Sequence, residues 1–237
     1  MSLLRVEKVT KRFGGITANE EVSFSLDAGQ IVGLIGPNGA GKTTIFNCIA
    51  GYAPPTSGAI WLDESDVTGF TPEQCARVGI SRTFQVARTF TSMTALENVM
   101  VGAFLANRNV GHARHAALEL LAFVNLGRHH DRPAASMTVS EQRRLAVARA
   151  LALRPKLLLM DEVMAGLNPT EVKETVEVVL KIRERGIACL IVEHVLEGIM
   201  PIADAIIVLD YGKKIADGTP AVVSNDPKVI AAYLGEE

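Results

Sequence analysis

The chain alternates short, wholly apolar runs with longer segments in which apolar residues recur every three or four positions. Four of the runs carry no polar residue on either face, and they predict buried strands at residues 31–35, 157–160, 188–192 and 205–209. A strand that is apolar on both faces needs helices above and below it, as in a parallel sheet. The pattern therefore predicts an α/β fold built on a mostly parallel sheet.

The N-terminal part and the middle of the chain follow other patterns. Apolar runs at residues 3–6, 22–26 and 59–62 are short and flanked by polar residues, which is typical of an antiparallel sheet. Between about residues 93 and 153 no strand pattern occurs, and helical spacing is shown by Ala117, Leu120, Leu121 and Val124. We therefore expect an antiparallel N-terminal unit and a helical insert in the α/β core.

A helix is predicted after Asn168. Asparagine is a favoured N-cap, Pro169 suits the first helical position, and Gly186 is suited to the end of the helix. Its apolar face is formed by Val172, Val176, Val179 and Leu180.

A glycine-rich segment with the Walker A pattern joins the predicted strand 31–35 to a helix. Its backbone N–H groups can turn inward around a phosphate, and the helix N-terminus adds partial positive charge. We expect Lys42 to reach the β- and γ-phosphates and the Thr43 hydroxyl to bind Mg²⁺. A glycine-rich turn without a ligand is the alternative, which this context disfavours. The predicted nucleotide contacts are Gly36, Pro37, Asn38, Gly39, Ala40, Gly41, Lys42, Thr43 and Thr44.

Two carboxylates, Asp161 and Glu162, follow the predicted strand 157–160. Beside a phosphate loop, the end of a strand is where a Walker B aspartate belongs, so Asp161 is expected to hold Mg²⁺ through water. Glu162 is then placed to polarise the attacking water. On its own an acidic pair after a strand more often begins a loop, but the phosphate loop favours the catalytic interpretation.

Composition and charge narrow the function further. The 237 residues carry 24 basic and 26 acidic side chains, a net charge of −2 with no basic block, so nucleic acid is not expected as a partner. The three cysteines show no paired spacing, which fits a reducing compartment and argues against disulfides or a zinc site. No apolar run approaches the roughly 18–20 residues that span a bilayer, and no signal peptide is predicted. A mean hydropathy of +0.22 requires a large core or a partner-covered surface.

The order of these motifs resembles that of ABC-type ATPases over nearly the whole chain. The resemblance implies that Gln85, in the run SRTFQ, joins the core to the helical insert and touches Mg²⁺ and the attacking water. It implies that His194, after the strand 188–192, contacts the γ-phosphate, and that Phe13 stacks on adenine. A core phenylalanine is the alternative for Phe13. The remaining histidines, in the polar insert, are expected to be solvated.

Within that superfamily several phrases resemble the ATP-binding subunits of branched-chain amino acid importers. They lie at residues 81–85, 165–169, 209–213, 218–220 and 233–235. Urea-uptake and lipopolysaccharide-export ATPases are close relatives and remain alternatives at this point.

The resemblance implies a P-loop NTPase (RecA-like) core with an antiparallel β-subdomain in residues 1–86 and 154–237. An α-helical subdomain is expected at 87–153. It further implies ATP and Mg²⁺ as cofactors, a second ATP-binding subunit (a copy or a paralogue), membrane-spanning permease subunits and, indirectly, a solute-binding protein. The subunit is expected in the cytoplasm, peripheral on the inner face of the membrane. A permease groove is expected near residues 86–93, filled by Phe84, Val86, Phe90 and Met93.

Three positions depart from the ABC pattern. Val163 replaces the proline that normally follows Walker B, and Asn168 stands where most members have aspartate. The signature Leu-Ser-Gly-Gly-Gln aligns with residues 137–141, Met-Thr-Val-Ser-Glu, so both glycines are replaced.

Thr138 and Ser140 are the predicted contacts to a nucleotide held by the second subunit. Thr138 and Glu141 have the spacing of a capping box, which predicts that the helix still begins here. The hypothesis is that dimerisation and hydrolysis are weakened, and a weakly hydrolysing regulatory subunit is one alternative function. An ABC ATPase working on DNA or ribosomes is another, disfavoured because the chain has no coiled coil and no basic face.

Overall fold

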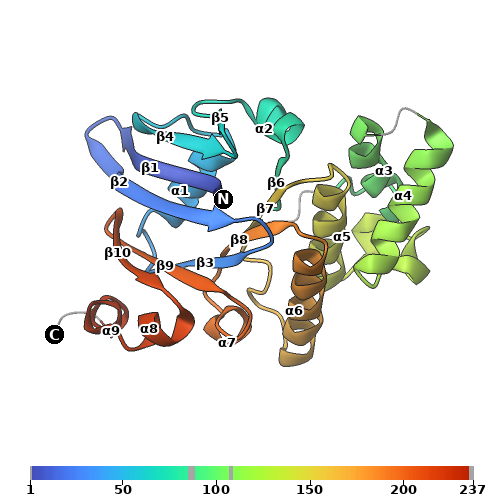
Figure 1. The fold of residues 1–237 in the computed structure, drawn as a ribbon. Helices are drawn as coiled ribbons and strands as arrows, with labels where there is room; N and C mark the ends of the chain where they lie inside the picture. Colours follow the sequence, from blue (N-terminus) through green and yellow to red (C-terminus); the bar gives the residue numbers. More distant parts are fainter. Residues whose placement is uncertain (1, 85–88, 107–108, 235–237) are drawn as a thin grey trace.

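The fold is described from a computed structural model of the 237-residue chain, in which residues 2–84, 89–106 and 109–234 are described. Its central element is a six-stranded sheet with the order β10-β9-β3-β8-β7-β6, in which all neighbours are parallel except the pair β9 and β10 (Figure 1). The strands are β3 (Ile31–Ile35), β6 (Ile80–Arg82), β7 (Leu157–Asp161), β8 (Ala188–Val192), β9 (Ala205–Asp210) and β10 (Lys213–Gly218). The four strands predicted from apolar runs are confirmed.

A second, antiparallel sheet lies over one face of the first and has the order β2-β1-β4-β5. Its strands are β1 (Ser2–Phe13), β2 (Ile16–Asp27), β4 (Ser57–Leu62) and β5 (Ser65–Asp66). The predicted N-terminal antiparallel unit is confirmed, but β1 and β2, with 12 residues each, are two to three times as long as their apolar runs. The two strands continue through exposed, largely polar residues up to the pair of Phe13 and Ile16.

The apolar side chains of the six-stranded sheet point alternately to its two faces, and each face is covered by a separate hydrophobic core that includes helices. Helix α1 (Lys42–Ile49) packs with the antiparallel sheet on one face, where Phe46, Val32 and Leu4 belong to one buried cluster. On the other face α6 (Pro169–Glu184) contributes Val179, which joins the core that contains Ile191. The remaining helices of this part are α2 (Pro72–Val78), α7 (Leu196–Ile199), α8 (Pro220–Ser224) and α9 (Pro227–Leu234).

The predicted start and end of α6 are confirmed. The Asn168 side chain accepts hydrogen bonds from the N–H groups of Thr170 and Glu171, both at 3.0 Å, and Pro169 is the first residue of the helix. Gly186 follows the C-cap residue Arg185 with a positive φ of 76°.

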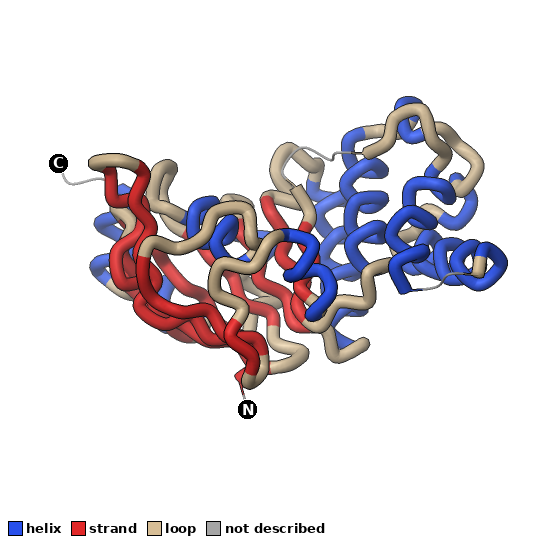
Figure 2. The backbone as a smooth tube through the Cα atoms, turned by 90° about the horizontal axis from the view of Figure 1, so that it is seen from above, coloured by secondary structure: helices blue, strands red, loops and turns tan. Residues whose placement is uncertain are grey.

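The middle of the chain forms a helical unit beside the end of the sheet (Figures 1 and 2). It consists of α3 (Ala95–Ala106), α4 (Val110–Phe123), α5 (Val139–Leu151) and two 3₁₀ turns, Gly127–His129 and Ala134–Ser136. As predicted, the described residues between 93 and 153 contain no strand, only an isolated bridge between Thr94 and Pro133. None of the described helices has the length and apolar character that crossing a membrane requires.

Candidate nucleotide site

The predicted phosphate loop connects β3 to α1 and is closely packed from behind. Gly36 and Gly41 have φ values of +146° and +94°. A Cβ on Gly36 would collide with the carbonyl oxygen of Leu209, and one on Gly41 would collide with the side chain of Asn19. Glycine is therefore required at both positions for the loop to curl against the core.

The loop and the start of α1 offer positive charge to an anion. Lys42 Nζ donates to the carbonyl oxygens of Gly36 at 2.7 Å and Pro37 at 2.8 Å, so the ammonium group lies over the loop. Burial lowers the pKa of Lys42, although the charges of Glu162 and Asp161 act in the opposite direction. Gly41, at the N-cap, has no side chain to bond the first N–H groups of α1. Together with the exposed Thr43, these groups fit a polyphosphate and its cation.

Asp161, at the end of β7, is buried and paired with Arg82 of β6. The distance from Asp161 Oδ2 to Arg82 Nη2 is 3.0 Å. Burial raises the pKa of Asp161 above its ordinary value, and the Arg82 guanidinium only partly opposes this. Arg82 Nη1 also donates to Asn47 Oδ1 at 2.6 Å, which ties the pair to α1. A carboxylate in this position fits a magnesium ligand, since the contact with Arg82 is made by Oδ2.

Sequence reasoning missed Arg82. It belongs to the run SRTFQ, which pointed to Gln85, but its partners Asn47 and Asp161 lie 35 and 79 residues away in the sequence. Gln85 itself lies outside the described residues, so its expected contact with Mg²⁺ stays a prediction.

Glu162 and His194 meet although they follow different strands, β7 and β8. Glu162 Oε1 lies 3.0 Å from His194 Nε2. Glu162 has a left-handed φ of +48°, and its N–H donates to the carbonyl of Val192 at 2.9 Å. A non-glycine residue in this region is held there by its surroundings. The arrangement places a carboxylate beside an imidazole, and the roles expected of the two residues, at the attacking water and at the γ-phosphate, stay predictions.

Phe13 lies on the surface at the end of β1, with 53% of its area exposed. Its ring faces the ammonium of Lys11 at 4.9 Å. The core alternative for Phe13 is therefore wrong, and the ring is available for stacking.

The predicted signature residues lie at the start of α5. The capping box is confirmed, because Thr138 N–H donates to Glu141 Oε2 at 2.8 Å and Glu141 N–H donates to Thr138 Oγ1 at 3.2 Å. Ser140 is buried, whereas Val139 is 64% exposed. Ser140 as a whole is covered in the single chain, so its expected contact with nucleotide stays a prediction.

The charge of Glu141 is held within its own subunit. Its Oε1 accepts a hydrogen bond from Arg132 Nη1 at 3.0 Å. Burial acts to raise the pKa of Glu141, but the N–H of Thr138 and the charge of Arg132 outweigh it and hold the pKa below its ordinary value. His129 and His130 are half-buried here, and His129 Nδ1 lies 3.1 Å from Arg132, so the expectation that both are fully solvated is wrong.

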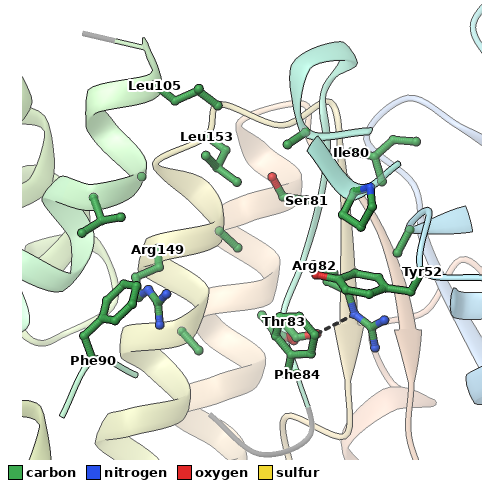
Figure 3. A pocket seen from close by; sticks show the side chains of 17 residues that line it. Tyr52, Ile80, Ser81, Arg82, Thr83, Phe84, Phe90, Leu105, Arg149 and Leu153 are labelled. Atoms are coloured by element: carbon green, nitrogen blue, oxygen red, sulfur yellow. Dashed lines mark hydrogen bonds between the residues drawn. The ribbon is translucent and has the colours of Figure 1, made fainter. Parts of the chain in front are cut away.

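A cavity of about 540 Å³ lies between the core and the helical unit. Figure 3 shows Tyr52, Arg82 and Phe84 on one side, and Leu105, Arg149 and Phe90 on the other. Phe84 and Phe90 were both expected to fill a permease groove. Val86, of the same prediction, lies outside the described residues.

Comparison with known proteins decides the family. A family model described as "ABC transporter" matches residues 19–165. The chain belongs to the ABC transporter family. A second model, described as "Branched-chain amino acid ATP-binding cassette transporter", matches residues 213–237 of this ABC ATPase.

Curated relatives of this ABC ATPase match it from end to end. It is 40% identical to the high-affinity branched-chain amino acid transport ATP-binding protein BraF of Pseudomonas aeruginosa, over 99% of this chain and 98% of the relative. It is 41% identical, with the same coverage, to the corresponding protein LivG of Salmonella typhimurium. A probable LivG of Methanocaldococcus jannaschii is 32% identical over 100% of this chain and 98% of its own length.

Solved structures agree with the fold. An ATP-binding cassette of an ABC transporter in its ADP conformation has a TM-score of 0.91 and 32% identity, and the match covers all of both chains. A dimeric cassette in a post-hydrolysis state bound to ADP and phosphate has a TM-score of 0.82 and 27% identity, over 92% of this chain and 98% of that one. The RecA-like P-loop fold is confirmed, and the chain is an ATP-binding subunit with ATPase activity.

Proposed function

We propose that this subunit drives the import of branched-chain or chemically related amino acids. The observation that carries the proposal is the agreement between full-length relatives named for branched-chain amino acid transport and the second family model at residues 213–237. The intact Walker residues Lys42, Asp161 and Glu162 supply the chemistry that such transport needs. The urea-uptake and lipopolysaccharide-export alternatives are not favoured by these matches.

In the proposed mechanism each residue of the site has one task. Lys42 and the loop N–H groups bind the β- and γ-phosphates of ATP, and Phe13 stacks on adenine. Thr43, Gln85 and Asp161 would hold Mg²⁺, which adds positive charge at the phosphate oxygens.

Hydrolysis depends on the pair at the ends of β7 and β8. Glu162 accepts a proton from the attacking water, and His194 steadies the γ-phosphate. Gln85 also orients that water. The 3.0 Å contact between Glu162 and His194 supports a shared site for the two side chains.

The site is completed by a second ATP-binding subunit, either a copy of this chain or a paralogue. The start of α5 in that subunit presents the free N–H groups of Val139 and Ser140 and the hydroxyl of Thr138 to the γ-phosphate. The dimeric cassette with ADP and phosphate supports this arrangement. ATP then joins the two subunits, and hydrolysis releases them.

The joining and release of the two subunits drives a movement of membrane-spanning permease subunits. These bind in the cavity between the core (residues 1–86 and 154–237) and the helical subdomain (87–153). The subunit thereby lies at the cytoplasmic face of the membrane. Solute choice belongs to the permease and to a solute-binding protein, and no nucleic acid takes part.

The test is uptake by the reconstituted complex. Vesicles that hold this subunit with its copurified permease and solute-binding protein are expected to accumulate radiolabelled leucine, isoleucine or valine when ATP is supplied. The Glu162→Gln variant is the control, because its amide keeps the shape but cannot accept the proton. Its turnover should fall by about 10²–10⁴-fold at unchanged ATP affinity. Uptake of another solute class in place of these amino acids would contradict the proposal.

A further inference from the structure

Glu193 lies between β8 and His194, and its side chain has no exposed area. Its carboxylate is surrounded by backbone donors. Oε1 accepts a hydrogen bond from the N–H of Met164 at 2.6 Å, and Oε2 accepts one from the N–H of His194 at 3.3 Å. The N–H of Val195 also bonds this carboxylate.

These donors belong to two different segments of the site. Met164 lies two residues after Glu162, in the connection between β7 and α6. His194 and Val195 open the connection between β8 and α7. One buried carboxylate therefore joins the segment that carries the proposed general base to the segment that carries the proposed γ-phosphate ligand.

The same segment is also fixed from below by packing. Met164 is fully buried, and a Cβ on Gly198 of α7 would collide with its sulfur. The space under the two connections is thus filled, and neither can shift alone without breaking a hydrogen bond or a contact.

A buried carboxylate is a costly way to fill such a space. Burial raises the pKa of Glu193 to about 7, and the N–H groups of Met164, Val195 and His194 only partly oppose it. An apolar side chain would satisfy packing but would leave the N–H of Met164 without this acceptor. The geometry therefore indicates that the bridge itself, and not mere filling, is the function of this side chain.

We propose that Glu193 is a positioning residue for ATP hydrolysis, whose carboxylate fixes His194 against the segment that carries Glu162. The inference rests on the roles proposed for Glu162 and His194. Its effect falls on turnover and not on ATP binding, because the bridge joins neither Lys42 nor the phosphate loop. Small displacements of reacting groups reduce rates by up to about 10²-fold.

The test compares Glu193→Gln with wild type in the complete transporter complex. The amide keeps the volume but turns an N–H donor toward the N–H of one segment, so the bridge is broken on that side. We expect kcat to fall by at least tenfold, while KM and the ATP affinity of the free subunit stay within twofold. Thr175→Val is the matched control, since it removes a buried hydrogen bond to Glu171 within α6 without touching the bridge. Its kcat should remain within twofold of wild type.

A double-mutant cycle with His194→Ala identifies the route. If Glu193 acts through His194, adding Glu193→Gln to His194→Ala should lower kcat by less than twofold further. Fully additive losses, an unchanged kcat, or a KM that rises together with a lower Tm would overturn the proposal. Should Glu193→Gln not fold, Glu193→Asp keeps the charge but is too short to reach both segments, and the same comparison applies. The roles proposed for Glu162 and His194 fail separately, if Glu162→Gln and His194→Ala both retain wild-type turnover.

Discussion

At the scale of single residues, the ionisable side chains of the site are arranged as neighbouring pairs. Asp161 is 3.0 Å from Arg82, and Glu162 is 3.0 Å from His194. Lys42 lies at the phosphate loop, where its ammonium bonds two loop carbonyls. A triphosphate can replace the two carbonyls as the hydrogen-bond acceptor of this ammonium, since a charged acceptor forms the stronger hydrogen bond.

Lys42→Ala is expected to abolish ATP binding while the fold is retained. The alanine removes the point charge, and the backbone N–H groups alone do not neutralise the phosphates. Binding of a fluorescent ATP analogue measures the loss, and a thermal melt within a few degrees of wild type confirms the fold. An affinity within twofold of wild type would show that the phosphate loop is misassigned.

Glu193 predicts a pH dependence of stability. Its pKa is raised to about 7 from an ordinary 4.5, so between these values the folded chain keeps a proton that the unfolded chain has released. The free energy of unfolding therefore falls as pH rises through this window, by at most about 3 kcal/mol, and the loss is complete above about pH 7. Urea unfolding at pH 5, 6, 7 and 8 should show this fall in wild type and a flatter curve in Glu193→Gln. Parallel curves for the two proteins would contradict the assignment.

At the scale of elements, the start of α5 shows which of the residues that depart from the signature pattern are exposed toward a nucleotide and which are not. The side chain of Ser140 is buried, so it does not obstruct the approach of a nucleotide, and Glu141 is engaged by Thr138 and Arg132. Val139 remains, with its side chain exposed at the first helical position. We expect this β-branched side chain to lengthen the contact between the γ-phosphate and the helix N–H groups without abolishing it.

Restoring Leu-Ser-Gly-Gly-Gln at residues 137–141 should raise ATP turnover of the complex several-fold without changing ATP affinity of the free subunit. Most of the gain should come from Val139→Gly alone, because of the two residues that replace glycines only Val139 is exposed. Ser140→Gly is the matched control and should change turnover by less than twofold. If the restored protein is no faster in the complex with its permease, the altered signature is neutral.

The elements that sequence reasoning found are those with a strong local signal. The four buried strands are continuous apolar runs, and the caps at Asn168 and Thr138 are short-range hydrogen-bond patterns. Strand β6 has only three residues and β10 is largely polar, so both depend on pairing with β7 and β9, to which they are bonded.

The candidate site divides in the same way. The Walker residues and His194 are recognisable from their spacing and order. Arg82 and Glu193 are not, because their significance arises from partners 79 and 29 residues away. Only the packed fold brings these side chains to their acceptors and donors.

At the scale of the whole molecule, the described cavity lies where the core and the helical unit meet. One wall comes from the core, with Tyr52 and Phe84, and the other from the helices, with Leu105 and Arg149 (Figure 3). A helix of a membrane partner seated here would contact both units at once. Among the described apolar side chains that line the cavity, Leu105 is the most accessible to such a helix, with 58% of its area exposed.

Leu105→Glu is expected to abolish copurification with the permease while ATP binding by the free subunit stays within twofold. The new carboxylate would have to be buried against an apolar partner surface, which is costly. Val222→Glu on α8 is the matched control, since Val222 is similarly exposed, at 62%, and does not line the cavity. Undiminished copurification of Leu105→Glu would show that the permease binds elsewhere.

Arg82 belongs to both the cavity and the cation site. Its guanidinium carbon lies 4.8 Å from the ring centre of Phe84 and 5.2 Å from that of Tyr52, while its Nη2 neutralises Asp161. An occupant that displaces these rings removes their contacts with Arg82, the internal counter-ion of Asp161. By thermodynamic reciprocity, the factor by which an occupant of the cavity changes the affinity of Asp161 for a cation is also the factor by which the cation changes the affinity of the cavity for its occupant. The membrane partner and the metal are thus coupled through one guanidinium, the partner by its contact with the rings and the metal by its competition for the Asp161 carboxylate, although neither needs to touch the other.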